Sequence, residues 1–268
     1  MKLELTNGYR LHFQELSRIL GYLIEQKERK IIPREEIIKV LGMSIRQFES
    51  LSSIMVALGL IKPSTFVLTT LGENISSKDL FFEKMETLWI MHYTISTNPK
   101  YVIWHRLVTQ VFLKETMISA PICIPYFSDL SENYSARSLE RKVPKEINAV
   151  LYAYSETEFQ KLNFISKIAT GLWKREEPQK ITTLPFLYAL LHHQELIGLQ
   201  STGFSLEETF NTALSPGKVL NLKKYEVELL FDQLHNTRFA KLETFGGLNQ
   251  LRYAHGLTKQ IIINEIYN

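Results

Sequence analysis

Two residues near the start of the chain, Gly42 and Ser44, constrain its fold more than any others. Gly42 closes a segment of apolar residues at helical spacing that begins after Pro33, and glycine commonly ends a helix because it tolerates a positive φ angle. Ser44 can cap the next helix by accepting a backbone N–H bond. The sequence therefore predicts a short helix, a turn over residues 42–44 and a second helix from Ile45 to Leu58.

The segments on either side extend this pattern. Apolar residues recur at helical spacing between His12 and Glu28, which predicts an earlier helix. The stretch from Ile61 to Leu71 holds a proline, β-forming residues and threonines, which is typical of a short hairpin. Three helices followed by a hairpin is the order of a winged helix-turn-helix, and we predict this fold for residues 1–75.

Beyond residue 75 the sequence predicts a mainly α-helical chain in two further domains. Residues 76–180 form a helical, aromatic-rich middle domain, and residues 181–268 combine helices and short strands in an α/β domain. In the last domain, a helix from Tyr225 to Leu234 precedes two alternating runs around Gly246-Gly247, which predicts a hairpin. A helix followed by a hairpin can also be interpreted as a second, degenerate winged element.

The composition places few limits on the partner. Lys and Arg total 31 against 28 Asp and Glu, and the resulting net charge of +3 neither demonstrates nor forbids a nucleic-acid partner. The single cysteine excludes an internal disulfide framework and a thiolate zinc cage, and it fits a reducing compartment. No apolar stretch reaches the ~18 residues of a membrane span. We therefore expect a cytoplasmic protein with no membrane partner.

Signatures of catalysis and of cofactor binding are missing from the sequence. Gly217-Lys218 lacks the other residues of a phosphate-binding loop, and neither His-Glu-x-x-His nor Gly-x-Ser-x-Gly occurs. His192 and His193 are adjacent, and a helix would point them about 100° apart. The apolar run from Thr87 to Tyr93 favours buried core over a base-stacking platform. We therefore expect no enzymatic activity, no cofactor and no metal site.

The helix from Ile45 is the candidate reader of duplex DNA. Its exposed face is expected to carry Arg46, Gln47, Glu49, Ser50 and Ser53. An arginine can donate two hydrogen bonds to guanine, and a glutamine can pair with the edge of adenine. Contacts to phosphates would come from Lys27, Arg29, Lys30, Arg34 and Lys62. The alternative is that the same winged helix packs against another protein.

A denser basic cluster lies in the middle of the chain. It consists of Arg137, Arg141, Lys142 and Lys145, just before and after Pro144, which we expect to open a helix. Arg137 and Arg141 share a face if this segment is helical, and such a face can bind adjacent phosphates. The alternative is a solvated surface, partly neutralised by Glu140 and Glu146.

Several motifs resemble a known bacterial family. They are TLGE (Thr70–Glu73), TLWIMHY (Thr87–Tyr93), SLERKV (Ser138–Val143), SPGKVLNL (Ser215–Leu222) and GGLNQLR (Gly246–Arg252), together with Asp79, Glu83, Trp104 and Phe112. In this order they resemble the family called domain of unknown function 4007. The resemblance implies no enzyme activity. Because members of that family lie near genes for DNA sulfur modification and phage defence, it implies a DNA-linked accessory role.

The sequence thus favours a non-catalytic DNA-binding accessory protein of a DNA-modification or phage-defence system. Its partners would be duplex DNA and other proteins of that system. The alternative is an interaction scaffold without direct DNA contact. Winged-helix proteins are often dimers, so a homodimer also stays open.

Overall fold

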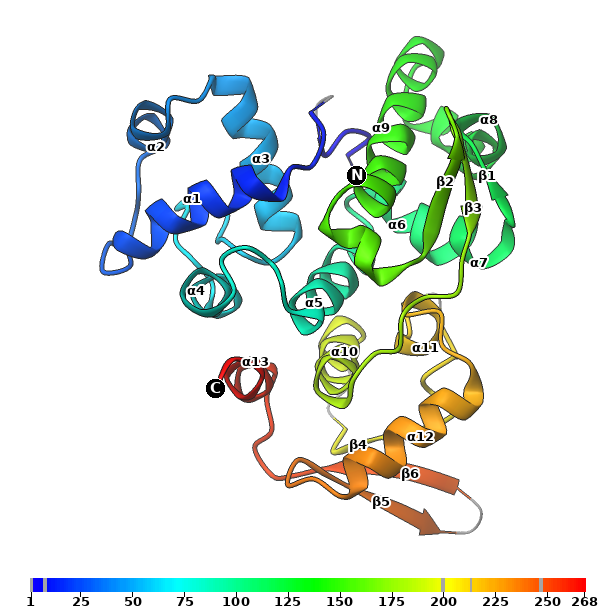
Figure 1. Ribbon diagram of the computed structural model, residues 1–268. Coiled ribbons are helices and arrows are strands. Elements are labelled where there is room, and N and C mark those ends of the chain that lie inside the picture. Colours follow the sequence, from blue (N-terminus) through cyan, green and yellow to red (C-terminus); the bar gives the residue numbers. More distant parts are fainter. Residues whose placement is uncertain (1, 7–8, 199–200, 213, 246–247) are drawn as a thin grey trace. The chain divides into compact units, whose positions relative to one another are not determined.

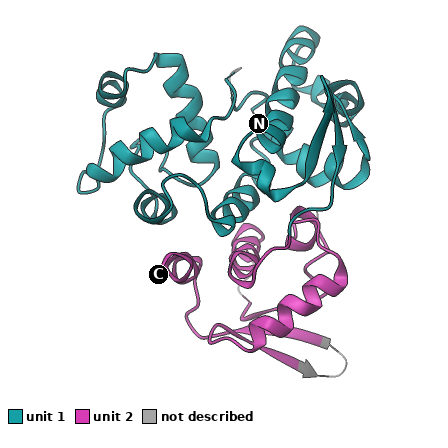
Figure 2. Ribbon diagram, in the orientation of Figure 1, with its two compact units in different colours: residues 1–179 teal, residues 180–268 magenta. Residues whose placement is uncertain are grey.

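The structure is a computed structural model that describes residues 2–6, 9–198, 201–212, 214–245 and 248–268 (Figure 1). The chain divides into two compact units, residues 1–179 and 180–268 (Figure 2). Each unit is mainly helical and contains a small antiparallel sheet. The three domains expected over 1–75, 76–180 and 181–268 stay a prediction.

The first unit begins with the helices that the apolar spacing predicts, α1 (Phe13–Glu25), α2 (Arg34–Leu41) and α3 (Ile45–Ala57). α1 buries one apolar face and contacts both α2 and α3. Gly42 lies in the left-handed region at φ 63° and ends α2. The Ser44 hydroxyl accepts the Gln47 N–H and caps α3. The predicted turn between these helices is therefore confirmed.

The stretch expected to form a hairpin is shorter than predicted. Ile61 and Leu68 form a single antiparallel bridge, and the Lys62 N–H donates to the Val67 carbonyl at 2.8 Å. α4 (Thr70–Lys78) begins immediately afterwards, because the Thr69 side chain caps it. The expectation that extended structure continues to Leu71 is wrong, since the helix cap at Thr69 ends it.

Helices and a small sheet complete the first unit: α5 (Met85–Ser96), α6 (Val102–Arg106), the π-helical turn η1 (Leu107–Val111), α7 (Phe112–Lys114), β1 (Met117–Ile118), α8 (Ala120–Cys123), the 3-10 helix η2 (Ile124–Glu132), α9 (Ala136–Glu156), the 3-10 helix η3 (Glu158–Leu162), β2 (Ile165–Ala169) and β3 (Leu172–Arg175). β3 lies between β1 and β2 and pairs antiparallel with both.

The core of this unit is aromatic. Every residue from Thr87 to Tyr93 in α5 is buried, which confirms the prediction that this run is core. The His92 Nδ1 lies 2.6 Å from the Tyr154 hydroxyl, and the Trp104 indole donates to the same hydroxyl at 3.3 Å. These side chains fix α5, α6 and α9 against one another.

α9 begins earlier than the sequence suggests. Ser135 caps it by accepting the Ser138 N–H, and Pro144 lies inside the helix. The expectation that Pro144 opens a helix is wrong. A proline at that position leaves one carbonyl of the preceding turn without its usual partner, but packing of the following turns holds the segment helical.

The first residues of the chain form what we call the N-terminal strap (residues 2–6), which contacts both α3 and α9. The Glu146 carboxylate, only 2% exposed, accepts the Leu5 N–H at 2.9 Å and the Thr6 hydroxyl at 2.8 Å. The Thr6 carbonyl in turn accepts the Ser50 hydroxyl at 2.5 Å. Leu3 and Leu5 are buried beside these bonds. The strap therefore connects α9 to α3.

The second unit contains α10 (Thr183–Leu196), β4 (Gly203–Ser205), α11 (Pro216–Val219), α12 (Lys224–His235), β5 (Ala240–Phe245), β6 (Leu248–Tyr253) and α13 (Lys259–Tyr267). β6 lies between β4 and β5, and α10 contacts α11, α12 and α13. The strands of the predicted hairpin are confirmed as β5 and β6. The turn expected at Gly246-Gly247 lies outside the described residues. Within the described chain, no helix has the length and apolar character that a membrane span requires.

Candidate functional site

The first turn of α3 is the exposed part of the predicted reading helix. Ile45, Arg46 and Glu49 are exposed and Gln47 is half-buried. The first turn holds no acidic residue. The Phe66 ring packs edge-to-face on Phe48, with ring centres 5.2 Å apart, and so fixes the loop of the Ile61–Leu68 bridge to α3. This contact places the exposed Lys62 on the loop that borders the start of α3.

The rest of α3 is less accessible than expected. Ser50 is fully buried, because its hydroxyl donates to Thr6 of the N-terminal strap. The expectation that Ser50 is exposed on the reading face is therefore wrong. Ser53, one turn further along the helix, is half-buried. A reading surface on α3 is thus limited to its N-terminal turns, from Ile45 to Glu49.

Arg29, expected to hold a phosphate, is engaged in an ion pair. Its two terminal nitrogens lie 2.5 and 2.8 Å from the Glu36 carboxylate oxygens, and the Tyr22 hydroxyl donates to the same carboxylate at 2.6 Å. The Arg29 hydrogen bonds, with help from Tyr22, lower the pKa of Glu36 to about 2. Glu36 is thus ionised at neutral pH, and it competes with phosphates for Arg29.

The other expected phosphate contacts fall into two groups. Arg34 lies 2.7 Å from Glu35 and 3.6 Å from Glu49, so its charge is shared with acids. Three lysines and one arginine are exposed and show no ion pair in the described parts of the chain: Lys27, Lys30, Lys62 and Arg46. These four are the cations most available to an anionic partner.

Large apolar side chains are exposed on the same part of the unit. Ile31, just before α2, is 62% exposed, Val40 at the end of α2 is 58% exposed, and Ile45 at the start of α3 is 57% exposed. Large exposed apolar side chains can take part in contacts with another protein. The beginning of the first unit therefore combines cationic and apolar groups.

The basic cluster of the middle segment lies on α9. Arg137 and Arg141 are exposed and share one face of the helix, as the sequence predicted for a helical segment, and the exposed Lys145 continues that face. Lys142 points to the flank, where it lies 2.8 Å from Glu4 of the N-terminal strap. The expectation that Glu146 partly neutralises this surface is wrong, because Glu146 is buried against the strap.

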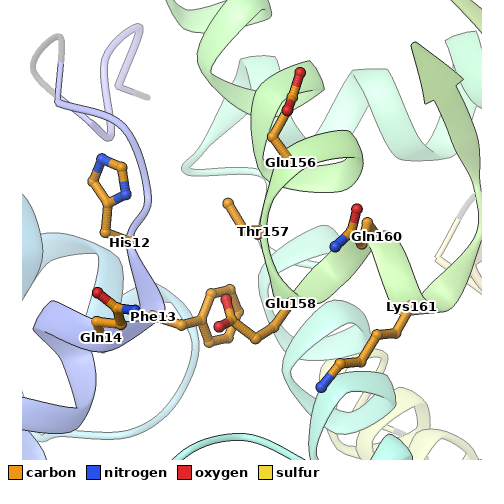
Figure 3. Close-up of a pocket in the computed structure, with 8 residues that line it drawn as sticks. All are labelled: His12, Phe13, Gln14, Glu156, Thr157, Glu158, Gln160 and Lys161. Carbon is orange, nitrogen blue, oxygen red and sulfur yellow. The ribbon is translucent and has the colours of Figure 1, made fainter.

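A polar cavity of about 280 Å³ lies between the start of α1 and the segment that runs from the end of α9 into η3. In Figure 3, His12 and Gln14 stand on the α1 side, across from Glu158, Gln160 and Lys161. Glu156 also lines it and is paired with Lys167 at 2.5 Å. No local pattern in the sequence indicates this cavity, because its two sides are about 145 residues apart in the chain and neither carries a motif.

The described residues show no cluster typical of a metal centre, and the one cysteine is buried. No group of three or more His, Cys, Asp or Glu side chains converges among them. Cys123 is buried, and burial with the nearby Glu115 charge raises the pKa of its thiol to about 12. In the second unit, Lys259 lies 2.8 Å from the His192 Nδ1 and 2.6 Å from Glu195. Burial and the Lys259 charge lower the pKa of His192 to about 3, so His192 is neutral and accepts the Lys259 hydrogen bond.

Comparison with known proteins identifies a family and a shared fold. A family model described as "Protein of unknown function (DUF4007)" matches residues 21–267. Two solved structures are similar, "Magnesium ion-bound SspB crystal structure" with a TM-score of 0.74 and "SspB crystal structure" with a TM-score of 0.72. Each is 11% identical, and each alignment covers 97% of this chain and 86% of the other. At this identity the likeness concerns the fold alone.

No curated protein matches the sequence. The family match, in contrast, spans both compact units, from within α1 to the last turn of α13. It also includes the motifs that suggested the resemblance, from TLGE at Thr70 to GGLNQLR ending at Arg252. The chain therefore belongs to the family of proteins of unknown function DUF4007.

Proposed function

We propose that this chain is a non-catalytic DNA-binding accessory protein of a bacterial DNA-modification or phage-defence system. In this proposal α1, α2, α3 and the Ile61–Leu68 bridge act as a winged helix-turn-helix. The start of α3 would enter the major groove of duplex DNA, and the loop with Lys62 would contact the backbone. Membership of the DUF4007 family and the SspB-like fold support a role in such a system.

The observation that carries the proposal is that Arg46 and Lys62 are both available on two segments that are held together. Both side chains are exposed, and the Phe48–Phe66 contact fixes the two segments to each other. Recognition helices of this class contact base edges mainly through their N-terminal residues. The burial of Ser50 by the strap is therefore compatible with DNA binding. Arg46 and Gln47 would contact bases, and Lys27, Lys30 and Lys62 would contact phosphates.

A charge-reversal experiment tests the reading surface. The double variant Arg46→Glu and Lys62→Glu should weaken binding to random duplex DNA by more than about tenfold, since it removes two cationic contacts and adds repulsion. The matched control is Lys100→Glu with Lys224→Glu, which changes the net charge equally at exposed positions elsewhere. Equal binding by the two variants would contradict the proposed surface.

A second measurement tests the absence of catalysis. One similar SspB structure contains a magnesium ion. In the described chain, no group of three or more His, Cys, Asp or Glu side chains is placed to hold a metal ion. Supercoiled plasmid incubated with the protein and Mg²⁺ should stay supercoiled. Accumulation of nicked or linear plasmid would contradict the non-catalytic part of the proposal.

The exposed Ile31, Val40 and Ile45 favour a second candidate, an interaction scaffold that binds a partner protein through the same surface. Salt separates the two candidates. DNA affinity falls steeply as salt rises because cations are released from the phosphates, whereas an apolar protein interface is less sensitive. If the scaffold function is the correct one, duplex DNA will show no salt-sensitive binding.

A further inference from the structure

The outward face of α9 carries a continuous stripe of polar side chains. Positions 137, 141, 145, 148 and 152 are three or four residues apart, so they lie above one another on one side of the helix. The opposite side buries Val143, Ile147, Val150 and Tyr154. No residue from 136 to 142 is buried, and Figure 1 shows this part of α9 extending beyond its neighbours. The stripe is therefore open to a long ligand.

The first three positions of this stripe are cationic and have no acidic partner in the described chain. They are Arg137, Arg141 and Lys145, all exposed. Of the two acids nearest to them in sequence, Glu146 is buried against the strap. Glu140 is exposed three residues from Arg137, but the two side chains form no ion pair in the described chain. Successive cations stand four residues apart, which is ~6 Å along a helix axis. This spacing suits contacts to successive phosphates of an extended strand.

The stripe ends on an aromatic and cationic platform. The Arg10 guanidinium lies over the Tyr152 ring, 4.5 Å from its centre, and the His12 ring approaches the same ring edge-on at 6.1 Å between centres. Arg10 and His12 are exposed, and Tyr152 is half-buried. His12 also lines the cavity of about 280 Å³ shown in Figure 3. Planar cationic and aromatic groups of this kind stack with unpaired bases.

We propose that the outward face of α9 is a second nucleic-acid surface, which binds single-stranded rather than duplex DNA. Arg137, Arg141 and Lys145 bind successive phosphates. One base stacks on the platform of Arg10, His12 and Tyr152, beside the polar cavity. A duplex satisfies only the phosphate contacts, because its bases are stacked on one another. This surface does not depend on α3, so it goes beyond the duplex binding proposed above.

Neighbouring residues of α9 provide a matched test of the phosphate contacts. Arg141→Gln alters the stripe, and Lys142→Gln makes the same charge change on the flank that faces Glu4. Binding to an oligothymidine strand is measured by fluorescence anisotropy over a series of salt concentrations. Arg141→Gln should weaken binding several-fold. It should also make the slope of log affinity against log salt concentration (the salt slope) shallower by about 0.7, the value of one single-strand phosphate contact. Lys142→Gln should leave both unchanged.

Stacking is tested with Tyr152→Leu, which keeps an apolar side chain against the core, and with an oligonucleotide that contains abasic sites. The wild-type protein should bind the abasic strand about tenfold more weakly than the intact strand, as expected for loss of one stacked base. Tyr152→Leu should bind the two strands equally. Circular dichroism of the variant confirms that α9 remains folded.

Several results would overturn this proposal. They are no binding of the wild-type protein to the single strand, equal losses for Arg141→Gln and Lys142→Gln, and the same abasic penalty in Tyr152→Leu. Arg46→Glu with Lys62→Glu should leave single-strand binding unchanged. If that double variant loses duplex binding alone, both proposals stand. If it has no effect on either nucleic acid, only the α3 proposal fails.

Discussion

At the scale of single residues, close packing explains why two of the family motifs contain a glycine. A Cβ atom at Gly72, in TLGE, would lie 2.0 Å from the Leu60 carbonyl oxygen. A Cβ at Gly217, in SPGKVLNL, would lie 2.4 Å from the Phe210 ring and 2.7 Å from the Thr209 carbonyl oxygen. The glycines of both motifs are therefore required by close packing and not by the chemistry of a site.

Gly72→Ala should destabilise the protein by about 2–3 kcal/mol, because the Leu60 backbone must move to admit a methyl group. The control is Gly21→Ala in the middle of α1, where the new Cβ would lie 4.0 Å from the Leu80 side chain. Alanine is the better helix former, so this variant should gain up to ~1 kcal/mol. Urea denaturation of both proteins measures the two free energies. Equal effects of the two substitutions would contradict the packing argument.

Glu146 is the residue whose burial has the clearest consequence for pH dependence. Burial raises its pKa above the ordinary value of 4.5, and the bonds from Leu5 and Thr6 only partly oppose this. A carboxyl whose pKa is higher in the folded state stabilises the fold below its unfolded pKa. That contribution is lost as pH rises through the folded value. The effect is thus opposite in sign to that of Glu36, whose pKa is lowered to about 2.

Glu146→Gln should remove the pH-dependent contribution that the buried carboxyl makes to the free energy of unfolding. Relative to wild type, the variant should become more stable as pH rises from about 4.5 toward neutrality, because it has no charge to bury. The control is Glu140→Gln, an exposed position on the same helix. Unfolding free energies at several pH values give the difference curves. A difference in unfolding free energy between wild type and Glu146→Gln that does not vary with pH would contradict the raised pKa of Glu146.

At the scale of elements, the ion pair between Arg29 and Glu36 limits the charge that α2 offers to a phosphate backbone. Glu36→Gln should remove a negative charge and release Arg29. Duplex affinity should rise several-fold, and the salt slope should become steeper by about 0.9. Glu73→Gln on α4 removes the same charge at an exposed position and serves as control. The same duplex affinity for both variants would show that Arg29 takes no part in binding.

Local signals predicted the elements well, whereas the contacts that shape the site depend on distant residues. Spacing and caps act over a few residues, so Gly42 and Ser44 were sufficient to predict the turn between α2 and α3. The burial of Ser50 depends on a residue 44 positions away, and the strap depends on Glu146, 141 positions from Leu5. No local pattern contains such pairs. Pro144 misled the prediction of α9 because long-range packing outweighed its local preference.

At the scale of the whole molecule, the two candidate surfaces both belong to the first compact unit, and the N-terminal strap connects the helices that carry them. The second unit has its own core around α10 and its own sheet. The family match includes both units, so they occur together in this family. The proposed DNA contacts of α3 and α9 can therefore be tested in the intact chain, without separating the units.

The central claim is that exposed cations around the start of α3 bind duplex DNA. The most direct test is the affinity of the full chain for a random duplex across a series of salt concentrations. Contacts from Lys27, Lys30, Arg46 and Lys62 predict that the logarithm of affinity falls with the logarithm of salt with a slope of about −3 to −4. A slope near zero, or no duplex binding at low salt, would contradict the account.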